Sequence, residues 1–385
     1  MAPASTTHEV VVVGGGLAGL AAAAILAQSG VRTALVEQQR FPFHRVCGEY
    51  LSNEAVPFLK RLGVEVEALG AVHMTRFEAS TLGGDRLQSQ LGLGGIGVSR
   101  YRLDSALAER ASALGVDLLQ GTRVHSICRS GEMFRCELLS SDGSLPHTLR
   151  SPLVLGCFGK RSRLDRELRR KNARRRSHYV AAKQHFGAPN ARTVQRSQTV
   201  ALHCIDGGYC GTSDVEHGRL NVCYLTTKRA FQTAGNHDAF LRAQAEANPA
   251  LSEAIRGRDP AMDPVFISQV DFGTKTAVED GVLLCGDSAG LIHPLCGNGM
   301  ALALRGAETL SQQVLRFLSG QISRPQLESN HRSAWRRSYG LRRSFSGHMQ
   351  RIFEHPPSAR ASLRIARTLP ILTRGLLRLS HGRPF

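Results

Sequence analysis

The sequence has few of the residues and patterns that identify metal-binding or disulfide-bonded proteins. It contains one tryptophan, and its nine cysteines include no C-x-x-C pair, so neither a zinc site nor a disulfide framework is indicated and we expect no metal. Cysteines scattered in this way are typical of a reducing compartment. We therefore expect a cytoplasmic location.

Acidic residues are scarce relative to basic ones. Among 385 residues, 49 are Lys or Arg and 31 are Asp or Glu, which gives a formal net charge of +18. The basic residues concentrate at 160–176 and again from Arg332 onward. Neither region has the interleaved aromatics of a nucleic-acid module, so we expect no nucleic-acid partner. A solvated basic surface and attraction to an anionic membrane or an acidic carrier protein both stay open.

A 22-residue stretch, 10–31, carries no charge, but it does not have the pattern of a membrane span or a signal peptide. Three glycines interrupt it, and the residues before it are polar and acidic rather than basic. The stretch instead predicts a strand over Val10–Val13, a turn and an alanine-rich helix. Within the turn, Gly14, Gly16 and Gly19 match the G-x-G-x-x-G dinucleotide-binding pattern.

Each position of this pattern has a physical task. Gly14 permits the turn, Gly16 lets the main chain approach a pyrophosphate, and Gly19 lets the helix pack on the strand. Free N–H groups and the helix dipole then hold the phosphates. Glu37 ends the next predicted strand, 33–37, where its carboxylate can accept hydrogen bonds from ribose hydroxyls.

A second glycine-rich region lies near residue 290. A predicted strand over 281–285 leads to Gly286 and Asp287, and Gly297, Asn298 and Gly299 precede a helix predicted from Met300 to Leu310. Between the two regions we predict helices over 53–62 and 99–114 and several short strands. Period-two alternation from Tyr179 onward predicts an antiparallel sheet covering a ligand. The last 75 residues are expected to form basic helices.

Taken together, the G-x-G-x-x-G segment with Glu37, the Gly286–Asp287 pair and the Gly297-x-Gly299 turn resemble FAD-dependent oxidoreductases of the para-hydroxybenzoate hydroxylase and geranylgeranyl reductase superfamily. The resemblance implies an α/β protein. A Rossmann-like FAD-binding domain would be interleaved with an antiparallel β-sheet substrate domain and followed by a C-terminal helical region. It also implies that Asp287 binds the ribityl chain and that the turn before Met300 faces the flavin N1 and C2 carbonyl edge, where a helix dipole stabilises reduced flavin.

The expected division of the chain alternates between the two domains. FAD-binding segments are expected at 1–75, 99–175 and 276–310, substrate-domain segments at 76–98 and 176–275, and the helical region at 311–385.

The resemblance assigns further site residues. Arg100 and Arg102 match the family's arginine before the second long helix, with a salt bridge to Asp104 or Glu109 as the alternative use. The segment Arg45–Glu49 looks like the basic residue, cysteine and glycine pattern of geranylgeranyl reductases. It adds Arg45 to the cofactor-binding residues and gives Cys47 a catalytic role, the alternative being a thiol that packs the loop.

Two residues near the second glycine-rich region complete the candidate set. His293 precedes Pro294 beside the expected flavin edge and could relay protons, whereas a surface histidine is the alternative. Cys296 precedes a helix N-terminus and is either reactive or a packing residue.

The chain departs from the family in two places. Hydroxylases have an Asp-Gly pair where this chain has Phe158 and Gly159, which questions direct use of NADPH. Tryptophan halogenases have a W-x-W-x-I-P motif, whereas Trp335 lies far along the sequence from the flavin segment, so halogenation of that type is not expected.

Two enzymatic hypotheses fit the resemblance. The first is an FAD-dependent monooxygenase that uses molecular oxygen, through a flavin C4a-hydroperoxide, on a lipophilic aromatic, polyketide-like or prenylated small molecule, with NAD(P)H or a partner reductase as electron donor. The alternative is a flavoenzyme that reduces carbon–carbon double bonds of an isoprenoid or lipid, with proton delivery by Cys47. A flavin-containing binding or electron-transfer protein is a third hypothesis.

The C-terminal stretch 361–379 spaces leucines and arginines at helical intervals. Such a helix could form a peripheral contact with an anionic membrane, or it could pack on the core with a basic outer face.

Overall fold

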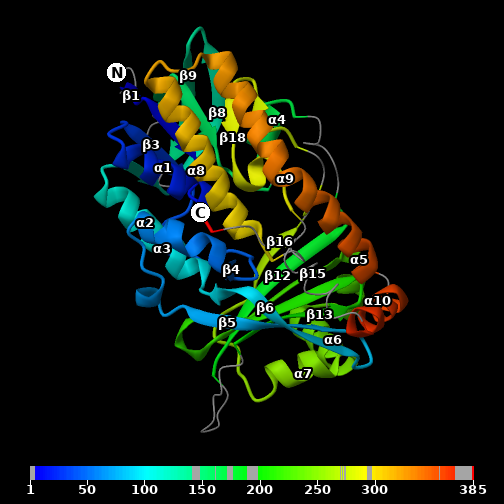
Figure 1. The fold of residues 1–385 in the computed structure, drawn as a ribbon. Helices are drawn as coiled ribbons and strands as arrows, with labels where there is room; N and C mark the ends of the chain where they lie inside the picture. Colours follow the sequence, from blue (N-terminus) through cyan, green and yellow to red (C-terminus); the bar gives the residue numbers. More distant parts are fainter. Residues whose placement is uncertain are drawn as a thin grey trace.

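The structure is a computed structural model of the full chain. It describes residues 5–140, 148–160, 162–170, 177–188, 198–268, 270, 272, 275–292, 297–354, 356–368 and 384–385. The chain forms two layers built on sheets, and a long helix runs along both of them (Figure 1).

The first layer is a six-stranded, mainly parallel sheet. Its order is β17 (Val278–Glu279), β18 (Val282–Leu284), β11 (Leu153–Gly156), β2 (Val10–Val13), β3 (Thr33–Glu37) and β7 (Asp117–Gln120). Only its edge pair β17–β18 is antiparallel among the described pairings. The central strand β2 is four valines that are buried throughout, because both faces of the sheet are covered.

Helices cover one face of this sheet. They are α1 (Leu17–Gln28), α2 (Val56–Arg61), α3 (Arg100–Ala113) and α8 (Gly299–Leu318), which share one apolar core with the sheet. The alanines of α1 allow its close approach to its neighbours. On the other face lies a four-stranded sheet in the order β1 (Ser5–Thr7), β10 (Thr148–Ser151), β9 (Met133–Ser140) and β8 (Thr122–Ser130).

The second layer is an eight-stranded sheet. Its order is β16 (Val265–Ser268), β12 (Tyr179–Phe186), β15 (Leu220–Thr227), β14 (Gly208–Asp214), β13 (Thr199–Ile205), β5 (Val72–Ser80), β6 (Arg86–Gly97) and β4 (Tyr50–Ser52). We predicted an antiparallel sheet, and its pairs are antiparallel except β5 with β13, which is parallel. Residues 50–52, within the expected first cofactor-binding segment, supply the edge strand β4.

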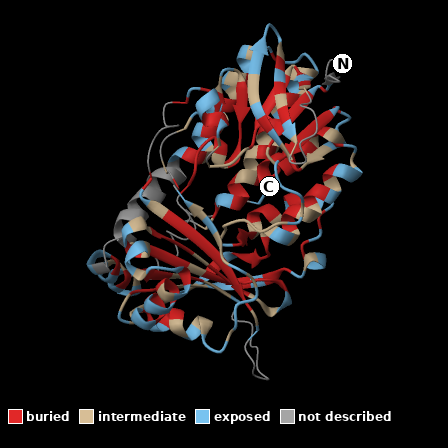
Figure 2. Cartoon of the chain, turned by 180° about the vertical axis from the view of Figure 1, so that it is seen from behind, coloured by how far each residue is buried: buried red, intermediate tan, exposed pale blue. Residues whose placement is uncertain are grey.

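Three helices pack on the outer face of the eight-stranded sheet: α5 (Lys228–Ala234), α6 (His237–Ala247) and α7 (Pro249–Ile255). Buried residues run through the sheets and the helix faces packed on them, whereas exposed residues lie on the outer turns (Figure 2). The short helices are η1 (Asn53–Ala55), η2 (Glu67–Leu69), α4 (Leu164–Glu167), η3 (Glu216–Gly218) and η4 (Gly286–Ser288).

The expected C-terminal helices are α9 (Arg324–Glu354) and α10 (Pro356–Thr368), and α8 extends eight residues past the predicted end at Leu310. Helix α9 runs from the first layer toward the second, where α10 follows it (Figure 1). Ala359 and Leu363 of α10 are buried, and Arg360 forms an ion pair with Asp85. Among the described helices, none is both long and apolar enough to cross a membrane.

Candidate active site

The glycine turn between β2 and α1 has the geometry of an anion-binding loop. Gly14 has φ +107°, and a Cβ at Gly19 would lie 1.9 Å from the carbonyl oxygen of Gly14. Gly16 is open, because the nearest neighbour of a Cβ there, among the described residues, is Nη2 of Arg100 at 3.9 Å. Gly16 is also the N-cap of α1, where no described side chain caps the helix. The first N–H groups of α1 are therefore available to a phosphate.

Glu37 lies at the end of β3 beside this turn. Its Oε2 accepts hydrogen bonds from the Gly15 N–H at 2.8 Å and from Nη2 of Arg45 at 3.1 Å, and its Oε1 accepts one from the Gln39 N–H at 3.0 Å. The carboxylate is thus fixed in a buried position next to the turn. Each carboxylate oxygen has more than one lone pair, so a ribose hydroxyl could share this acceptor.

Asp104 pairs with Arg45 and Arg100, which both lie beside the glycine turn. Its carboxylate accepts two hydrogen bonds from Arg100, at 2.6 and 2.8 Å, and one from Arg45 at 3.0 Å. Arg45 also donates to the carbonyl oxygen of Gly15. Burial would lower the pKa of Arg100, but the neighbouring Asp104 outweighs it and raises the pKa above its usual value. The Arg100 guanidinium therefore stays charged beside the glycine turn.

The structure distinguishes between Arg100 and Arg102, which the resemblance left as alternatives for the arginine near the flavin. Arg100 lies at the glycine turn and also makes the salt bridge to Asp104. Arg102 points elsewhere, with Nη1 2.8 Å from Nε2 of His217. Of the two, Arg100 is therefore the one that lies beside the glycine turn.

Gly286 and Asp287 bring the second glycine-rich region to the first. A Cβ at Gly286, whose φ is +63°, would lie 3.1 Å from Cβ of Ala18 and 3.8 Å from Cβ of Ala303. Ala18 is the second residue of α1 and Ala303 the fifth residue of α8, so the N-terminal parts of both helices meet at this glycine. Asp287 is the middle residue of η4 and lines a small cavity together with Gly299. Two helix N-termini at one place favour an anionic ligand.

The turn before α8 lies against the second layer. Gly297, with φ +62°, is close to the ring of Tyr50 in β4, and Asn298, the N-cap of α8, is buried. The candidates His293 and Cys296 lie outside the described residues, as do Pro294 and Leu295. The structure therefore does not place them.

Residues 45–50 run between the two glycine regions. Arg45 contacts the first turn and Tyr50 contacts the second, so the intervening residues border the expected path of a bound flavin. Cys47 is half-buried there, and its carbonyl oxygen accepts a hydrogen bond from Nδ2 of Asn221 at 3.2 Å. Ser213 donates to the carbonyl oxygen of Gly48 at 2.8 Å. Side chains of the second layer thus fix the loop 45–50 by hydrogen bonds to its backbone.

Behind Cys47 lies a buried ionic cluster. Glu49, with φ 53°, accepts hydrogen bonds from Nζ of Lys183 at 2.5 Å and from the Arg100 N–H at 2.7 Å, and its Oε2 lies 2.6 Å from Nε2 of His185. Nζ of Lys183 is also 3.3 Å from Nδ1 of His44. Glu49 and Lys183 have 0 % exposed surface and His185 has 1 %. A left-handed, buried glutamate persists only where its surroundings fix it.

Electrostatics keep Glu49 charged despite its burial. Burial would raise the pKa of Glu49, but the Lys183 ammonium and the His185 hydrogen bond outweigh it and hold that pKa below its usual value. Burial, with Lys183 nearby, lowers the pKa of His44 to about 4. At neutral pH, Glu49 is therefore ionised and His44 is neutral, so Nδ1 of His44 can accept a hydrogen bond from Nζ of Lys183.

Sequence reasoning missed this cluster, whereas Asp104 was named as a salt-bridge partner and does pair with Arg100. The signal that could have found part of it is in β12, where Lys183 and His185 stand two residues apart in an otherwise mainly apolar strand. Two polar residues at that spacing share one face of a strand. Their partner Glu49 is 134 residues from Lys183 in the sequence, and no local pattern connects the two.

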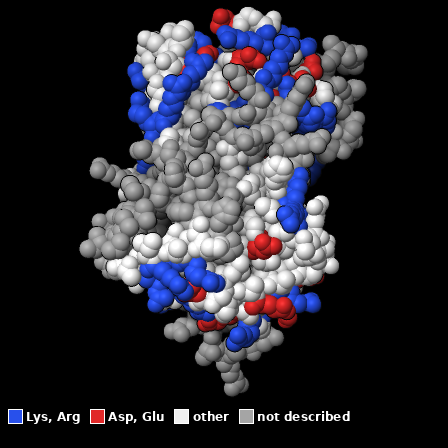
Figure 3. Space-filling view, turned by 90° about the vertical axis from the view of Figure 1, so that its right-hand side faces the viewer, with Lys and Arg blue, Asp and Glu red and all other residues white. Residues whose placement is uncertain are grey.

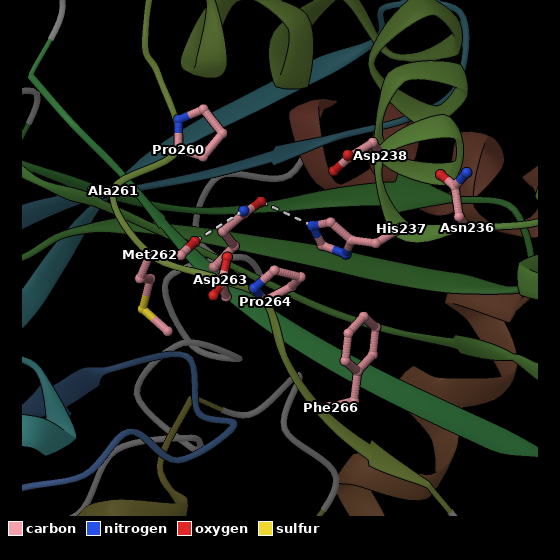
Figure 4. A pocket seen from close by; sticks show the side chains of 10 residues that line it. Asn236, His237, Asp238, Pro260, Ala261, Met262, Asp263, Pro264 and Phe266 are labelled. Atoms are coloured by element: carbon pink, nitrogen blue, oxygen red, sulfur yellow. Dashed lines mark hydrogen bonds between the residues drawn. The ribbon is translucent and has the colours of Figure 1, made fainter.

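The opposite face of the same strand has a different environment. Gln184 binds Nε2 of His237, and together with Asn236, Asp238 and Phe266 they line an open pocket of about 780 Å³ (Figure 4). The remaining lining residues are 260–264. Because Lys183 and Gln184 point to opposite faces, this pocket is separated from the cofactor region by the sheet.

Two departures from the family pattern can also be placed. Gly159, which follows Phe158, donates through its N–H to Oγ of Ser288, so this loop is tied to the Gly286–Asp287 segment. Trp335, distant in the sequence, is close in space: it lines the small cavity shared by Asp287 and Gly299 and stacks on Tyr339. The long sequence separation between Trp335 and the Gly286–Asp287 segment therefore did not indicate that the two lie close together in the fold.

On the face shown in Figure 3, the described Lys and Arg residues do not form one continuous stripe. There, Lys and Arg gather in separate groups, with acidic and uncharged residues between them. Arg170, part of the basic region at 160–176, is buried and paired with Asp165. Part of the positive charge in this basic region therefore forms buried ion pairs within the fold and is not exposed on the surface.

Comparison with known proteins agrees with this geometry. A family model described as FAD binding domain matches residues 7–341. The menaquinone reductase of Mycolicibacterium smegmatis is 26% identical over 310 residues, which cover 78% of this chain and 74% of that protein.

Two solved structures share the fold. The myxobacterial chondrochloren halogenase CndH has a TM-score of 0.79 and 17% identity, with 96% of this chain and 90% of that chain covered. PqsL, a probable FAD-dependent monooxygenase from Pseudomonas aeruginosa, has a TM-score of 0.73 and 17% identity, with 93% and 99% covered. The chain belongs to the FAD-binding domain family, and it is an FAD-dependent oxidoreductase.

Proposed function

We propose that the protein is an FAD-dependent monooxygenase acting on a lipophilic aromatic, polyketide-like or prenylated small molecule. The main observation in support is that residues 45–50 join the two glycine regions and lie under the eight-stranded sheet. A flavin held there would be enclosed between two layers, where water is excluded from the reacting atoms. PqsL, which shares the fold, is described as a probable monooxygenase.

The residues present fit FAD. The open Gly16 and the uncapped N-terminus of α1 would hold the pyrophosphate, with Arg45 and Arg100 nearby. Glu37 would bind the ribose, and Asp287 would bind the ribityl chain. Bound FAD would supply two-electron redox chemistry and the activation of molecular oxygen.

The chain's own residues then have binding and positioning roles. The N-terminal end of α8, preceded by Gly297 and Asn298, would stabilise negative charge at the flavin edge. In this proposal the first layer binds the cofactor and the second layer covers the substrate. We propose NAD(P)H as the transient electron donor, with a partner reductase as the other source of electrons.

A labelling experiment tests monooxygenation. The FAD-loaded protein is reduced without oxygen and mixed with ¹⁸O₂ and lipophilic aromatic compounds, and the products are analysed by mass spectrometry. Incorporation of one ¹⁸O atom from the gas is expected. If the reduced protein transfers its electrons to an alkene without consuming oxygen, monooxygenation is wrong.

Reduction of a carbon–carbon double bond is the second candidate function. Two observations favour it: the half-buried Cys47 borders the expected flavin path, and the menaquinone reductase is similar over most of its length. In this case Cys47 would deliver a proton. Loss of alkene reduction in Cys47→Ala, with unchanged FAD binding, would support that role.

A further inference from the structure

Two buried polar atoms beside the Glu49 cluster have no hydrogen-bond partner among the described residues. They are Nδ1 of His185 and Oδ1 of Asn221. The two residues are direct partners across β12 and β15, so their side chains project from the same face of the sheet. A buried polar atom without a partner costs about 1–3 kcal/mol, and two neighbouring ones indicate a ligand.

The protonation of His185 follows from its contact with Glu49. The ionised carboxylate can only accept hydrogen bonds, so Nε2 of His185 carries a proton. In the neutral ring, Nδ1 then has a free lone pair. Asn221 uses Nδ2 as the donor to Cys47, which leaves Oδ1 as an acceptor. Both free atoms are therefore acceptors, and a ligand that fits them must bring a hydrogen-bond donor.

The position of the pair connects it to the flavin region. Asn221 holds the carbonyl of Cys47, in the loop that borders the expected flavin path. Nζ of Lys183 donates to Oε1 of Glu49 and lies 3.3 Å from Nδ1 of His44, whose ring also meets the His185 ring edge-on, with 5.2 Å between the ring centroids. A proton taken up at Nδ1 of His185 would give an imidazolium whose Nε2–H faces the Glu49 carboxylate.

We propose that His185 and Asn221 bind a hydroxyl group of the substrate and that His185 is the residue that accepts its proton. The substrate O–H bond breaks, an Nδ1–H bond forms on His185, and the electron pair stays on the substrate oxygen. Nothing is oxidised or reduced in this step. The imidazolium is stabilised by Glu49, which makes Glu49 and Lys183 positioning residues. The proposal deepens the proposed function and rests on it.

A fluorinated phenol tests this step without turnover. The probe is 4-fluorophenol, whose ¹⁹F resonance moves when the hydroxyl ionises, and the control ligand is 4-fluoroanisole, which has no hydroxyl proton. Binding to the FAD-loaded full chain is followed by ¹⁹F NMR at a pH where the free phenol is protonated. We expect the bound phenol to show the ionised resonance and to bind at least tenfold more tightly than the anisole.

Variants separate proton acceptance from a structural role. His185→Gln keeps a donor toward Glu49 but cannot take a second proton, so the bound probe is expected to show the neutral resonance. The matched control is His237→Asn, a buried histidine on the opposite face of the sheet, and it should keep the ionised resonance.

Three results overturn the inference: no binding of 4-fluorophenol, a neutral resonance in the unaltered protein, or an ionised resonance that persists in His185→Gln. If the protein takes up FAD and one of these results is found, the proposed function still stands. If the protein takes up no FAD, as judged by visible absorbance, both proposals are wrong.

Discussion

Gly16 and Gly19 stand three residues apart but face different constraints. A Cβ at Gly19 would collide with the backbone of Gly14, whereas a Cβ at Gly16 would make one ordinary contact, with Nη2 of Arg100 at 3.9 Å. We therefore expect Gly16→Ala to fold with an almost unchanged melting temperature and to lose at least about tenfold in FAD affinity, or about 1.4 kcal/mol. Fluorescence titration with FAD and thermal melting measure the two effects.

The control for this substitution is Gly92→Ala, in an open position of β6 that is away from the cofactor region. It should change neither quantity. Full FAD affinity in Gly16→Ala would contradict the assignment of the pyrophosphate to this turn.

Asp104 is the buried anion between two arginines, so its charge matters more than that of a surface acid. Asp104→Asn would leave Arg45 and Arg100 without their shared counterion, and we expect the free energy of unfolding to fall by about 3–5 kcal/mol. Denaturant unfolding measures the change. Glu253→Gln, which removes an exposed pair with Arg86, should cost under about 1 kcal/mol. Similar losses in both variants would refute the argument.

Local sequence patterns predicted those site residues whose role is to permit a particular backbone conformation. Gly14 and Gly19 were predictable because a tight turn and a close helix approach tolerate no side chain, and this requirement appears in the spacing itself. Glu49 and Lys183 were not predictable, because their pairing depends on two layers meeting across 134 residues of sequence. The left-handed φ of Glu49 could not be predicted either, because glutamate rarely adopts this conformation and no sequence pattern marks it.

Among the elements, α9 brings the chain's single tryptophan to the cofactor region. Trp335 lines the cavity that contains Asp287 and Gly299. We expect added FAD to quench tryptophan emission, because the flavin would bind within reach of the indole. The measurement is a fluorescence titration of the FAD-free protein.

Asp287→Ala tests the same contact, since loss of the ribityl ligand should shift the quenching curve to higher FAD concentration. Glu328→Gln, on the same helix α9 but paired with Arg324 and Arg332, is the control and should leave the curve unchanged. If the tryptophan emission does not change when FAD is added, the cofactor does not bind beside Asp287.

The C-terminal helix α10 bears on the membrane hypothesis. Ala359 and Leu363 already pack on the protein, which favours a core-facing helix for the described part, whereas Ile365 is exposed. Residues 369–383 lie outside the described residues. We expect sedimentation with anionic liposomes to be lost when residues 360–385 are deleted if this region contacts a membrane. Equal sedimentation of both forms, with neutral liposomes as the control, would remove the membrane proposal.

Element types were easier to predict than their partners. The valine run of β2 and the alanines of α1 predicted a buried strand and a close-packed helix, because hydrophobicity and side-chain size act locally. The parallel pairing of β5 with β13 and the recruitment of β4 to the second layer were not predictable. Strand order depends on the packing of whole layers, which no short window of sequence records.

For the whole molecule, buried neutral histidines predict a loss of stability in mild acid. Burial, with a smaller effect of Arg86, lowers the pKa of His203 to about 4. Between about pH 6.5 and pH 4 the unfolded chain binds a proton that the folded chain does not, so the free energy of unfolding falls as the pH falls. The full effect is on the order of 3 kcal/mol.

Denaturant unfolding of the unaltered protein and of His203→Gln, from pH 8 to pH 5, measures this effect. The variant should lose less stability than the unaltered protein on acidification. His73→Gln, which removes an exposed histidine, should follow the unaltered protein. Parallel curves for all three proteins would show that His203 takes up its proton equally in both states.

The pairing of β5 with β13 joins Arg76 to Thr199, so the second layer is completed by strands from distant parts of the chain. Neither layer is a contiguous module that can be cut out, and a truncated gene would express only an incomplete sheet with open edges. Engineers who wish to exchange the substrate-covering layer would have to transplant at least two separate stretches at once.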